Sequence, residues 1–456
     1  MNLRRLLIAN RGEIALRIVR AAKAKGVETV LAVSAADRDS QAAIEADRTV
    51  VIGAAPARAS YLNGDLLVHT ALVTQCDAVH PGYGFLSERA SFAEQCEKAG
   101  LTFVGPRAET IRLVGDKLAA RALAKAAGVA MVSGSEKVDT VADALQIAEG
   151  IGYPVITKAS AGGGGRGMVV ANSAAELEAA FDNASHEAKE AFGDGTLYLE
   201  RYVQRARHVE VQVVGDGNGN ILHFGERDCS LQRRYQKMVE EAPAAILSDA
   251  VRSRLHQAAI DLLSPIKYRN AGTVEFLYDE ADERFYFMEV NARIQVEHPV
   301  SEEICGIDLI QLQLDVASGE PLQLIQADIE PRGHAIEVRI IAENPLNGFM
   351  PSPGRITQWL EPQGEGVRVD TAMKTGVLVP PFYDSMIGKL IVRGGDRGEA
   401  LTRLRAALDA FVIEGISTNL ELLRAIVGHP DFVGNVIDTR WSERVLLPSY
   451  LSSKGK

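Results

Sequence analysis

The N-terminal part of the chain alternates between short apolar runs and longer amphipathic stretches. An apolar run at residues 6–9 precedes a helical pattern over residues 13–25, and a second apolar run follows at residues 29–34. Further strand and helix signals continue through residues 102–105. Strands that alternate with helices predict βαβ units around a parallel sheet.

The first turn of this predicted sheet differs from a dinucleotide-binding turn. A nicotinamide or flavin site would need the motif GxGxxG directly after the first strand. The chain has ANRGE at residues 9–13 instead. We therefore expect neither nicotinamide nor flavin as a cofactor.

The middle of the chain predicts a small lid followed by a second sheet. Helix formers from residue 116 lead to a strand ending at Lys158, a glycine-rich run, a helix around 174–191 and the strand TLYLERYV. Residues 209–228 place strand-like runs on both sides of a Gly/Asn turn, which predicts a β-hairpin.

After Pro331 the pattern changes to short strands punctuated by proline and glycine, followed by helices through about Val427. This change predicts a third, mixed domain, with the final residues SSKGK as a frayed tail. Three domains suit a chain of 456 residues, because one hydrophobic core rarely serves such a length.

Composition and charge narrow the class of protein. Hydrophobic residues make up 46% and charged residues 24%, which is typical of a folded globular protein. The formal net charge is −11, whereas a protein that binds nucleic acid through its phosphates presents a basic surface. Without a signal-like or membrane-length apolar run at the N-terminus, we expect a cytoplasmic protein with no membrane association. Its four widely spaced cysteines predict reduced thiols, without disulfides or a zinc site.

The run AGGGGRGM at residues 161–168 is a candidate phosphate-binding loop. Glycines without Cβ atoms let backbone N–H groups approach a polyphosphate. A flexible surface linker would have the same glycines. Lys158 and Arg166 on either side favour phosphate binding. The run is not a P-loop, because no GK[ST] closes it.

Two glutamates on neighbouring strand-like runs form a candidate metal site. Glu275 and Glu289 are separated by the turn sequence DEADER, so a hairpin would bring their carboxylates together. Asn291 projects to the same face as Glu289. Two carboxylates and an amide oxygen suit Mg²⁺ that bridges nucleotide phosphates. The alternative is a pair of solvated edge-strand acids, but apolar and aromatic neighbours favour the metal.

The adjoining segment carries Arg293, Gln295 and Glu297 at alternate positions. An extended backbone would aim all three side chains at one small ligand. Arginine can hold a carboxylate-like anion bidentately, and Glu297 is placed to take a proton from it. An ordinary surface ion pair is the alternative. Residues 226–237 concentrate basic side chains that could supply a local positive field, or that could form a solvated face.

Together these motifs make the whole chain resemble the biotin carboxylase subunit of acyl-CoA carboxylases. The matching segments are LLIANRGEIALRI, HPGYGFLSE, GGGGRGM, ERDCSLQRR, EVNARIQVEHPV and YDSMIGKLI. The resemblance implies an α/β and α+β chain with the ATP-grasp fold. Its parts would be a Rossmann-like pre-ATP-grasp domain at 1–114, an ATP-grasp domain at 115–330 with a mobile lid at about 132–203, a mixed biotin carboxylase C-terminal domain at 331–446 and a tail at 447–456.

The resemblance also implies a role for each residue that matches a family motif. The residues implied for ATP are Lys117, Lys158, Gly163, Gly164, Gly165, Met168, Glu200, Arg201, Tyr202, Val203, His208, Gln232, Tyr235, Leu277 and Glu289. Those implied for bicarbonate are Lys237, Arg293, Gln295, Val296 and Glu297. Those implied for biotin are Tyr83, Gly84, Arg339 and Asp384, and those for Mg²⁺ or Mn²⁺ are Glu275, Glu289 and Asn291.

The implied mechanism proceeds through carboxyphosphate. Glu297 would deprotonate bicarbonate, which attacks the γ-phosphorus of ATP while two divalent ions and the lysines offset the developing charge, with Lys237 and Arg293 among the catalytic residues. Carboxyphosphate would then break down to carbon dioxide and phosphate. Phosphate would remove the ureido proton of biotin, Arg339 would stabilise the enolate-like oxygen, and the ring nitrogen would attack carbon dioxide.

Three positions depart from the family pattern. Tyr235 stands where the common motif RRHQK has histidine, which changes the length and pKa of a group close to the nucleotide. Ala292 replaces a frequent threonine, and Ala161 replaces the first of five glycines. The last two are expected to be tolerated, because Ala292 points away from the face that carries Asn291 and Arg293.

The partners implied are a biotin carboxyl carrier protein and carboxyltransferase subunits on separate chains. No biotin-attachment segment of the AMKM type follows the third domain, and the sequence AMKT at 372–375 lacks the second methionine. The family likeness implies a homodimer. Two other functions stay open: an ATP-grasp carboxylase of a free urea or guanidine compound, and a catalytically silent nucleotide-binding paralogue. The second is disfavoured because Lys237, Glu297 and Arg339 are all retained.

Overall fold

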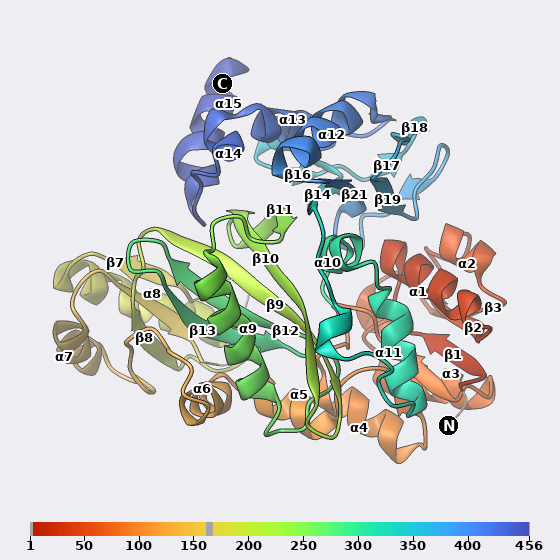
Figure 1. Cartoon of the computed structure of the whole chain (residues 1–456), viewed down its shortest axis with the longest axis horizontal. Coiled ribbons are helices and arrows are strands. Elements are labelled where there is room, and N and C mark those ends of the chain that lie inside the picture. The colour runs from red at the N-terminus through yellow and green to blue at the C-terminus, as the bar shows by residue number, and fades with distance from the viewer. Residues whose placement is uncertain (1–2, 161–166, 456) are drawn as a thin grey trace.

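A computed structural model describes residues 3–160 and 167–455, shown in Figure 1. The N-terminal part forms a five-stranded sheet in the order β3-β2-β1-β4-β5, and all its pairings are parallel, as the alternating pattern predicts. The elements are β1 (Arg5–Ile8), α1 (Gly12–Ala24), β2 (Glu28–Ser34), α2 (Gln41–Glu45), β3 (Arg48–Gly53), α3 (Gly64–Val73), β4 (Ala78–His80), α4 (Ala90–Lys98) and β5 (Thr102–Phe103).

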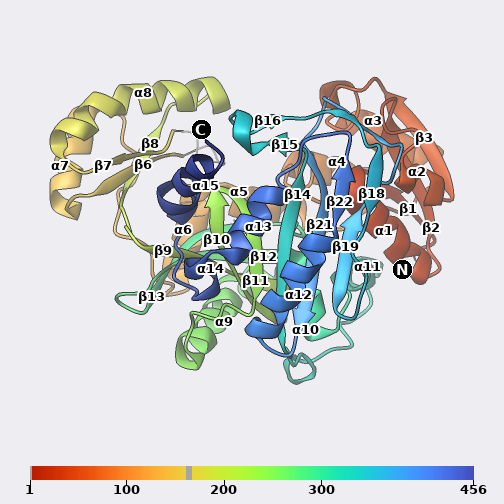
Figure 2. The ribbon, with the colours of Figure 1, turned by 90° about the horizontal axis from the view of Figure 1, so that it is seen from above.

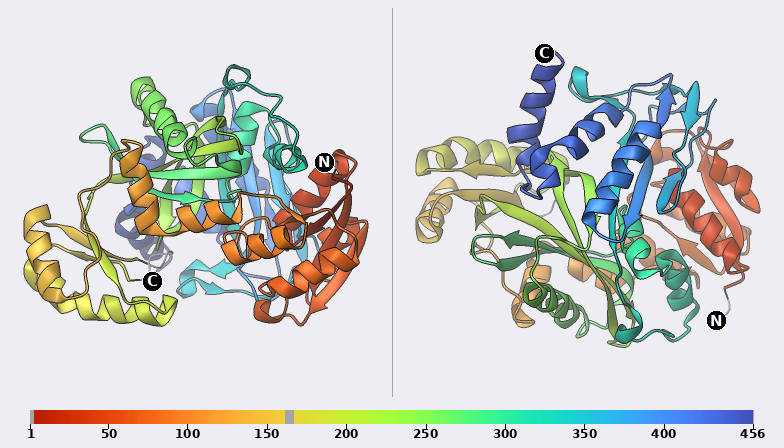
Figure 3. Two further views of the ribbon diagram at one scale, coloured as in Figure 1. Left: turned by 90° about the horizontal axis from the view of Figure 1, so that it is seen from below. Right: turned by 45° about the horizontal axis from the view of Figure 1, so that its top comes forward.

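Two helices lead from this sheet to a small separate unit, which we call the lid. The linking helices are α5 (Ala108–Gly115) and α6 (Lys117–Ala126). The lid contains α7 (Val141–Ile151), β6 (Val155–Ala159), β7 (Val169–Ala171), α8 (Ala174–Phe192) and β8 (Leu197–Arg201). Its three strands pair in the order β7-β6-β8, and Leu177, Phe181 and Leu199 belong to a hydrophobic core of its own. The lid lies at one end of the molecule (Figures 1 and 3).

The largest sheet has eight strands in the order β13-β12-β9-β10-β11-β14-β21-β19, and all its pairings are antiparallel. The predicted hairpin is present as β9 (Ala206–Asp216) and β10 (Ile221–Arg233). The other elements of this middle region are β11 (Gln236–Ala242), α9 (Asp249–Leu263), β12 (Arg269–Asp279), β13 (Arg284–Asn291), α10 (His298–Cys305) and α11 (Leu309–Ser318).

The C-terminal part adds strands to the same sheet rather than building a separate one. β11 pairs with β14 (His334–Ile341), which pairs with β21 (Met386–Gly394), which pairs with β19 (Val367–Thr371). A second core forms between these strands and the helices α12 (Arg397–Ala410), α13 (Leu420–Gly428) and α14 (Pro430–Val433). Shorter strands are β15 (Glu343–Asn344), β16 (Met350–Pro351), β17 (Gly354–Arg355), β18 (Gln358–Leu360), β20 (Leu378–Val379) and β22 (Val412–Glu414). Figure 2 shows this part alongside the N-terminal sheet.

The chain end is more ordered than SSKGK suggests. Helices continue beyond Val427, and α15 spans Leu447–Ser453. Tyr450 on this helix is buried in the C-terminal core, so hydrophobic packing rather than local propensity holds the helix. Within the described ranges, none of the helices combines the length and the apolar character needed to span a bilayer. All four cysteines carry free thiols, as predicted.

Candidate active site

One cavity of about 620 Å³ gathers the side chains predicted for metal, anion and biotin. It lies on the eight-stranded sheet, between the N-terminal loop after β4 and the loop that leads into β21. The predicted residues that line it are Tyr83, Gly84, His208, Tyr235, Lys237, Glu275, Glu289, Asn291, Arg293, Gln295, Val296, Arg339 and Asp384.

The two candidate metal-binding glutamates face each other across the β12–β13 hairpin. Glu275 and Glu289 are paired in register, as the turn between their strands predicts. Burial and the negative charge of Glu275 raise the pKa of Glu289. Asn291 donates its amide to Glu275 Oε1 at 2.7 Å. His208 Nε2 lies 3.0 Å from the other oxygen of Glu275. Two acids forced together in this way suit a divalent cation.

Glu297 is completely buried at the floor of the cavity between two cations. Its Oε1 accepts a hydrogen bond from Lys237 Nζ at 2.6 Å, and its Oε2 accepts one from Arg339 Nη2 at 3.0 Å. Burial alone would raise the pKa of Glu297, but Lys237 and Arg339 hold it well below its usual value. Glu297 is therefore an ionised carboxylate. We call Lys237, Glu275, Glu297 and Arg339 the reaction floor.

The backbone that carries Glu297 differs from the extended segment predicted. The strand ends at Asn291, and Glu297 is the residue before α10, with φ −82° and ψ 11°. Arg293 and Gln295 line the cavity, whereas Glu297 does not line it and lies buried behind Lys237 and Arg339, which do. The turn into α10 therefore directs the Glu297 side chain to Lys237 and Arg339 and not to the face that carries Arg293 and Gln295.

Arg293 is held by a residue that the sequence analysis missed. Its Nε donates to Glu88 Oε2 at 2.7 Å, and its Nη1 donates to Gln295 Oε1 at 2.7 Å. Its Nη2 donates to Asn291 Oδ1 at 3.0 Å. Glu88 ends the motif HPGYGFLSE, which was the only signal in the sequence for this contact.

The basic segment 226–237 supplies less positive field than predicted. Arg227 is fully buried and pairs with Glu210 at 2.6 Å. Arg233 lies over the Phe349 ring at 3.7 Å and pairs with Glu343 at 3.4 Å. Acidic partners therefore neutralise these arginines.

Lys237 is the cation from this segment that reaches the reaction floor. It contacts Glu210 at 2.6 Å as well as Glu297. Burial lowers the pKa of Lys237, but the surrounding carboxylates more than offset this and keep it above its ordinary value.

Most of the residues predicted for ATP lie beyond this cavity, toward the lid. Glu200 on β8 accepts hydrogen bonds from Lys158 on β6 and from Arg121 on α6. Gln232 Nε2 lies 2.7 Å from His208 Nδ1, which joins this group to the cavity. Lys117 begins α6, Arg201 ends β8 and Tyr202 follows it, Met168 precedes β7, and Val203 and Leu277 share a small apolar cluster. Gly163, Gly164 and Gly165 lie outside the described residues.

Tyr235 occupies the tight turn between β10 and β11. Arg234 and Tyr235 both have positive φ, at 47° and 64°, as the two central residues of a type I′ hairpin turn do. The Tyr235 side chain is 55% exposed and borders the cavity. The position where Tyr235 replaces the histidine of the family motif thus lies in a strained turn and not on the buried reaction floor.

The C-terminal segment also contacts the residues predicted for ATP, which no local signal predicts. Arg440 Nη1 donates to the Tyr202 hydroxyl at 3.3 Å across 238 residues. Thr439 N donates to Ala206 O at 3.0 Å, and the Ser442 hydroxyl donates to Gln232 O. Residues from the far end of the chain therefore pack against the group of residues predicted for ATP.

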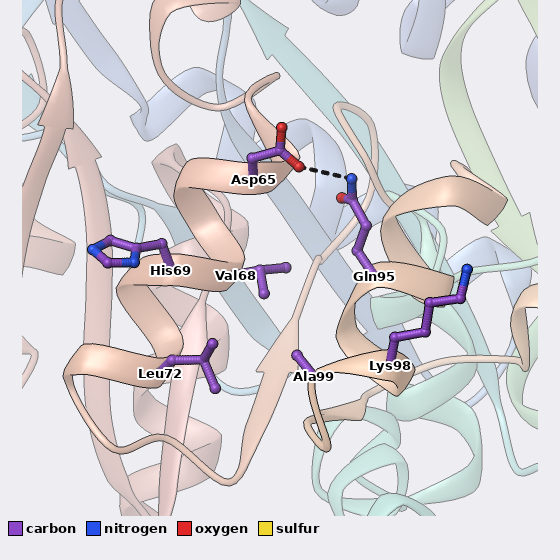
Figure 4. A pocket seen from close by; sticks show the side chains of 7 residues that line it. All are labelled: Asp65, Val68, His69, Leu72, Gln95, Lys98 and Ala99. Carbon is purple, nitrogen blue, oxygen red and sulfur yellow. Dashed lines mark hydrogen bonds between the residues drawn. The ribbon is translucent and has the colours of Figure 1, made fainter.

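A second, open pocket lies between α3 and α4 (Figure 4). Asp65, His69, Gln95 and Lys98 line it together with apolar side chains, and Gln95 donates to Asp65 at 2.8 Å. Its lining, within the part of the chain that the structure describes, includes none of the predicted site residues.

A lid with its own core, joined to a large antiparallel sheet that carries paired carboxylates and buried cations, is the arrangement of the ATP-grasp class of ligases. Three family models match in succession: the biotin carboxylase N-terminal domain at residues 2–111, the ATP-binding domain of the carbamoyl-phosphate synthase L chain at 116–325, and the biotin carboxylase C-terminal domain at 337–444. The chain belongs to the biotin carboxylase family.

Individual relatives agree with this assignment over nearly the whole chain. Biotin carboxylase 1 of Bacillus subtilis is 49% identical over 97% of this chain and 98% of its own length. A biotin carboxylase complex with β,γ-ATP from Campylobacter jejuni is 45% identical, with a TM-score of 0.94 over 97% of this chain and 99% of that one. The biotin carboxylase domain dimer of Hydrogenobacter thermophilus 2-oxoglutarate carboxylase, in complex with MgADP, ADP and bicarbonate, is 44% identical, with a TM-score of 0.94 over 97% and 98%.

Proposed function

We propose that the chain carboxylates biotin, using ATP and bicarbonate, while the biotin is attached to a separate carrier protein. The observation that carries the proposal is the reaction floor, where ionised Glu297 lies between Lys237 and Arg339 beneath the Glu275–Glu289 pair. This arrangement places a proton acceptor, two cations and a metal-binding pair around one cavity. Family membership supports the same activity.

Bicarbonate would bind among Lys237, Arg293, Gln295 and the backbone at Val296. Glu297 would take its proton, and the resulting oxyanion would attack the γ-phosphorus of ATP, releasing ADP and forming carboxyphosphate. In the ligand-free arrangement Glu297 is a weak base, because both flanking cations stabilise its charge. As Lys237 and Arg339 turn toward anionic substrates, Glu297 would lose that stabilisation and gain affinity for the proton.

Carboxyphosphate would then break down to carbon dioxide and phosphate within the same cavity. Phosphate would remove the ureido N–H proton of biotin, and the nitrogen would attack carbon dioxide. Arg339 would stabilise the ureido oxygen, while Tyr83, Gly84 and Asp384 surround the ring. Exclusion of water by the lid would protect carboxyphosphate from hydrolysis.

The residues present fit a divalent cation between Glu275 and Glu289. The two carboxylates are directly opposed, and all the oxygens available there are of the hard type that Mg²⁺ or Mn²⁺ prefers. When bound, such ions neutralise charge on the triphosphate. Lys117, Lys158, Glu200 and His208 would contact the nucleotide from the lid side, and the lid would close as one body because it has its own core.

We further propose the division into domains at 1–114, 115–330 and 331–446, which the ranges of the three family matches support. A carboxyltransferase would act as a further partner, and the enzyme would work as a cytoplasmic homodimer. The dimer named for the Hydrogenobacter domain supports the homodimer.

The deciding experiment measures ADP release with and without bicarbonate and free biotin, for the wild type and for Glu297→Gln. We expect release to depend on bicarbonate and to rise with biotin, and the Gln variant to lose ~10²–10⁴-fold of this rate, since it cannot take the proton. The exposed Glu190→Gln serves as a matched control and should behave like the wild type. Stimulation by a ureide but not by biotin, or unchanged turnover in Glu297→Gln, would contradict the proposal.

A further inference from the structure

The biotin end of the cavity is built by two loops that lie far apart in the sequence. Tyr83 and Gly84 come from the loop after β4, and Asp384 comes from the loop between β20 and β21. The first loop belongs to the N-terminal sheet and the second to the C-terminal part. The space for a ring between them therefore depends on how these two parts of the chain are fastened together.

The residues next to each wall meet in one aromatic cluster. Phe85 follows Gly84, and Tyr383 precedes Asp384. Their ring centroids lie 6.5 Å apart, edge to face, and both rings pack on Tyr61, at 5.0 Å for Phe85 and 5.7 Å for Tyr383. Such geometry is the favourable one for aromatic pairs.

Polar contacts fasten Tyr383 to the N-terminal sheet. Its hydroxyl donates to the Ala55 carbonyl at 2.5 Å and lies 2.6 Å from the Ser34 hydroxyl, at the end of β2. The Arg11 guanidinium lies 4.1 Å above the Tyr383 ring. These contacts join segments more than three hundred residues apart.

A second layer holds these partners in place. Asp37 accepts hydrogen bonds from Nε and Nη2 of Arg11, at 2.8 and 2.9 Å, and another from the Tyr61 hydroxyl at 2.7 Å. Ser34 and Asp37 are buried. The groups that contact Tyr383 are thus themselves held by hydrogen bonds. Because Asp384 is the next residue, the position of Tyr383 fixes the position of Asp384.

We propose that Tyr383 is a positioning residue for biotin, which sets the distance between the Tyr83–Gly84 wall and the Asp384 wall by fastening one loop to the N-terminal sheet. The inference rests on the proposed function. Loss of its hydroxyl contacts would let the Asp384 loop shift, and a displacement of about 1 Å is enough to impair a bound substrate. The reaction floor would be unaffected, because the large sheet holds it independently.

The test is steady-state kinetics of Tyr383→Phe with free biotin, ATP and bicarbonate. The variant keeps the ring under Arg11 and removes only the hydroxyl. We expect the KM for biotin to rise about tenfold, because the loop loses the two hydrogen bonds of the Tyr383 hydroxyl to Ala55 and Ser34. The KM for ATP and the biotin-independent ATP hydrolysis should stay within about twofold. Ser34→Ala should raise the KM for biotin about threefold, and the double variant should add little to Tyr383→Phe, because both remove the same contact.

Tyr153→Phe is the matched control, since its hydroxyl is buried in the described structure without a hydrogen-bond partner. It should leave the KM for biotin unchanged. An unchanged KM for biotin in both Tyr383→Phe and Ser34→Ala, or an equal rise for biotin and ATP, would overturn the inference while wild-type activity still supports the proposed function. A wild type without biotin-stimulated ADP release would overturn both.

Discussion

The reaction floor and the lid are held together in different ways. Lys237, Glu275, Glu297 and Arg339 lie on or beside the eight-stranded sheet and are linked to each other by buried ion pairs. The lid has a three-stranded sheet and a separate hydrophobic core, and its described link to α6 includes the Arg121–Glu200 ion pair. The floor is therefore organised before substrates bind, whereas the lid is a unit with a hydrophobic core of its own.

This difference separates two requirements of phosphoryl transfer. Charges must already be in place when the transition state forms, because reorganising them during the reaction would add to the barrier. Nucleotide must also enter and leave, which favours a part with its own core and low coupling to the rest. Variants that disturb one region and spare the other would test this separation.

The largest effect is expected for Lys237→Met in the floor. The change removes the cation that Glu210, Glu275 and Glu297 share, and breaking a buried ion pair by removing one partner costs ~3–5 kcal/mol of unfolding free energy. Urea unfolding would measure the loss, and bicarbonate-dependent ADP release should fall nearly to zero. Lys98→Met is the control, because its pair with Glu94 is exposed and contributes below ~1 kcal/mol. Equal losses in the two variants would contradict a pre-organised floor.

A smaller and local effect is expected for Glu200→Gln in the lid. Burial raises the pKa of Glu200, but Lys158 and Arg121 lower it further than burial raises it. The folded-state pKa thus lies below the unfolded one, so the stabilisation is present above the ordinary glutamate pKa and is lost as the pH falls through the folded value. At neutral pH the variant should cost the lid ~1–3 kcal/mol, and less in acid.

Hydrogen exchange of the β6 and β8 amides against pH would measure this effect. The exposed Glu178→Gln on α8 supplies the control. Protection should fall in the lid strands of Glu200→Gln while β9 and β12 keep theirs. Equal loss in both sheets would show that the lid and the floor open together.

The smallest effect is expected for Tyr235→His, at the border between the two regions. Histidine adopts positive φ more readily than most residues, so the turn at 64° should not be destabilised. The kcat/KM for ATP should stay within about tenfold, equivalent to ~1.4 kcal/mol. A larger change in kcat/KM would indicate that the side chain at position 235 contacts the reacting groups directly.

Local patterns predicted those elements whose partners are close in sequence. The alternation of strands and helices gave the parallel sheet, and the Gly/Asn turn gave the β9–β10 hairpin. The Glu275–Glu289 register followed from one short turn. Most of these pairings are decided within a few tens of residues, where periodicity and turn chemistry act, although β1 also pairs with β4 some 72 residues further on.

The remaining features depend on contacts between distant segments. Glu88 and Arg293 are 205 residues apart, and Arg440 and Tyr202 are 238 apart. The pairing of Arg227 with Glu210 is different, because the two residues are only 17 apart and lie opposite each other in the β9–β10 hairpin. The Gly/Asn turn predicted that hairpin but not which residues face each other across it. The roles of site residues came instead from the family likeness.

The pairing of β11 with β14 has a practical consequence for anyone who wishes to divide the protein. Val239 pairs with Val338 in the interior of one continuous sheet. Removal of everything after Pro331 would therefore leave β11 paired with β10 on one side and without β14 on the other. The exposed row of backbone N–H and C=O groups would invite association with other chains. Such a fragment should aggregate instead of folding into a smaller nucleotide-binding protein.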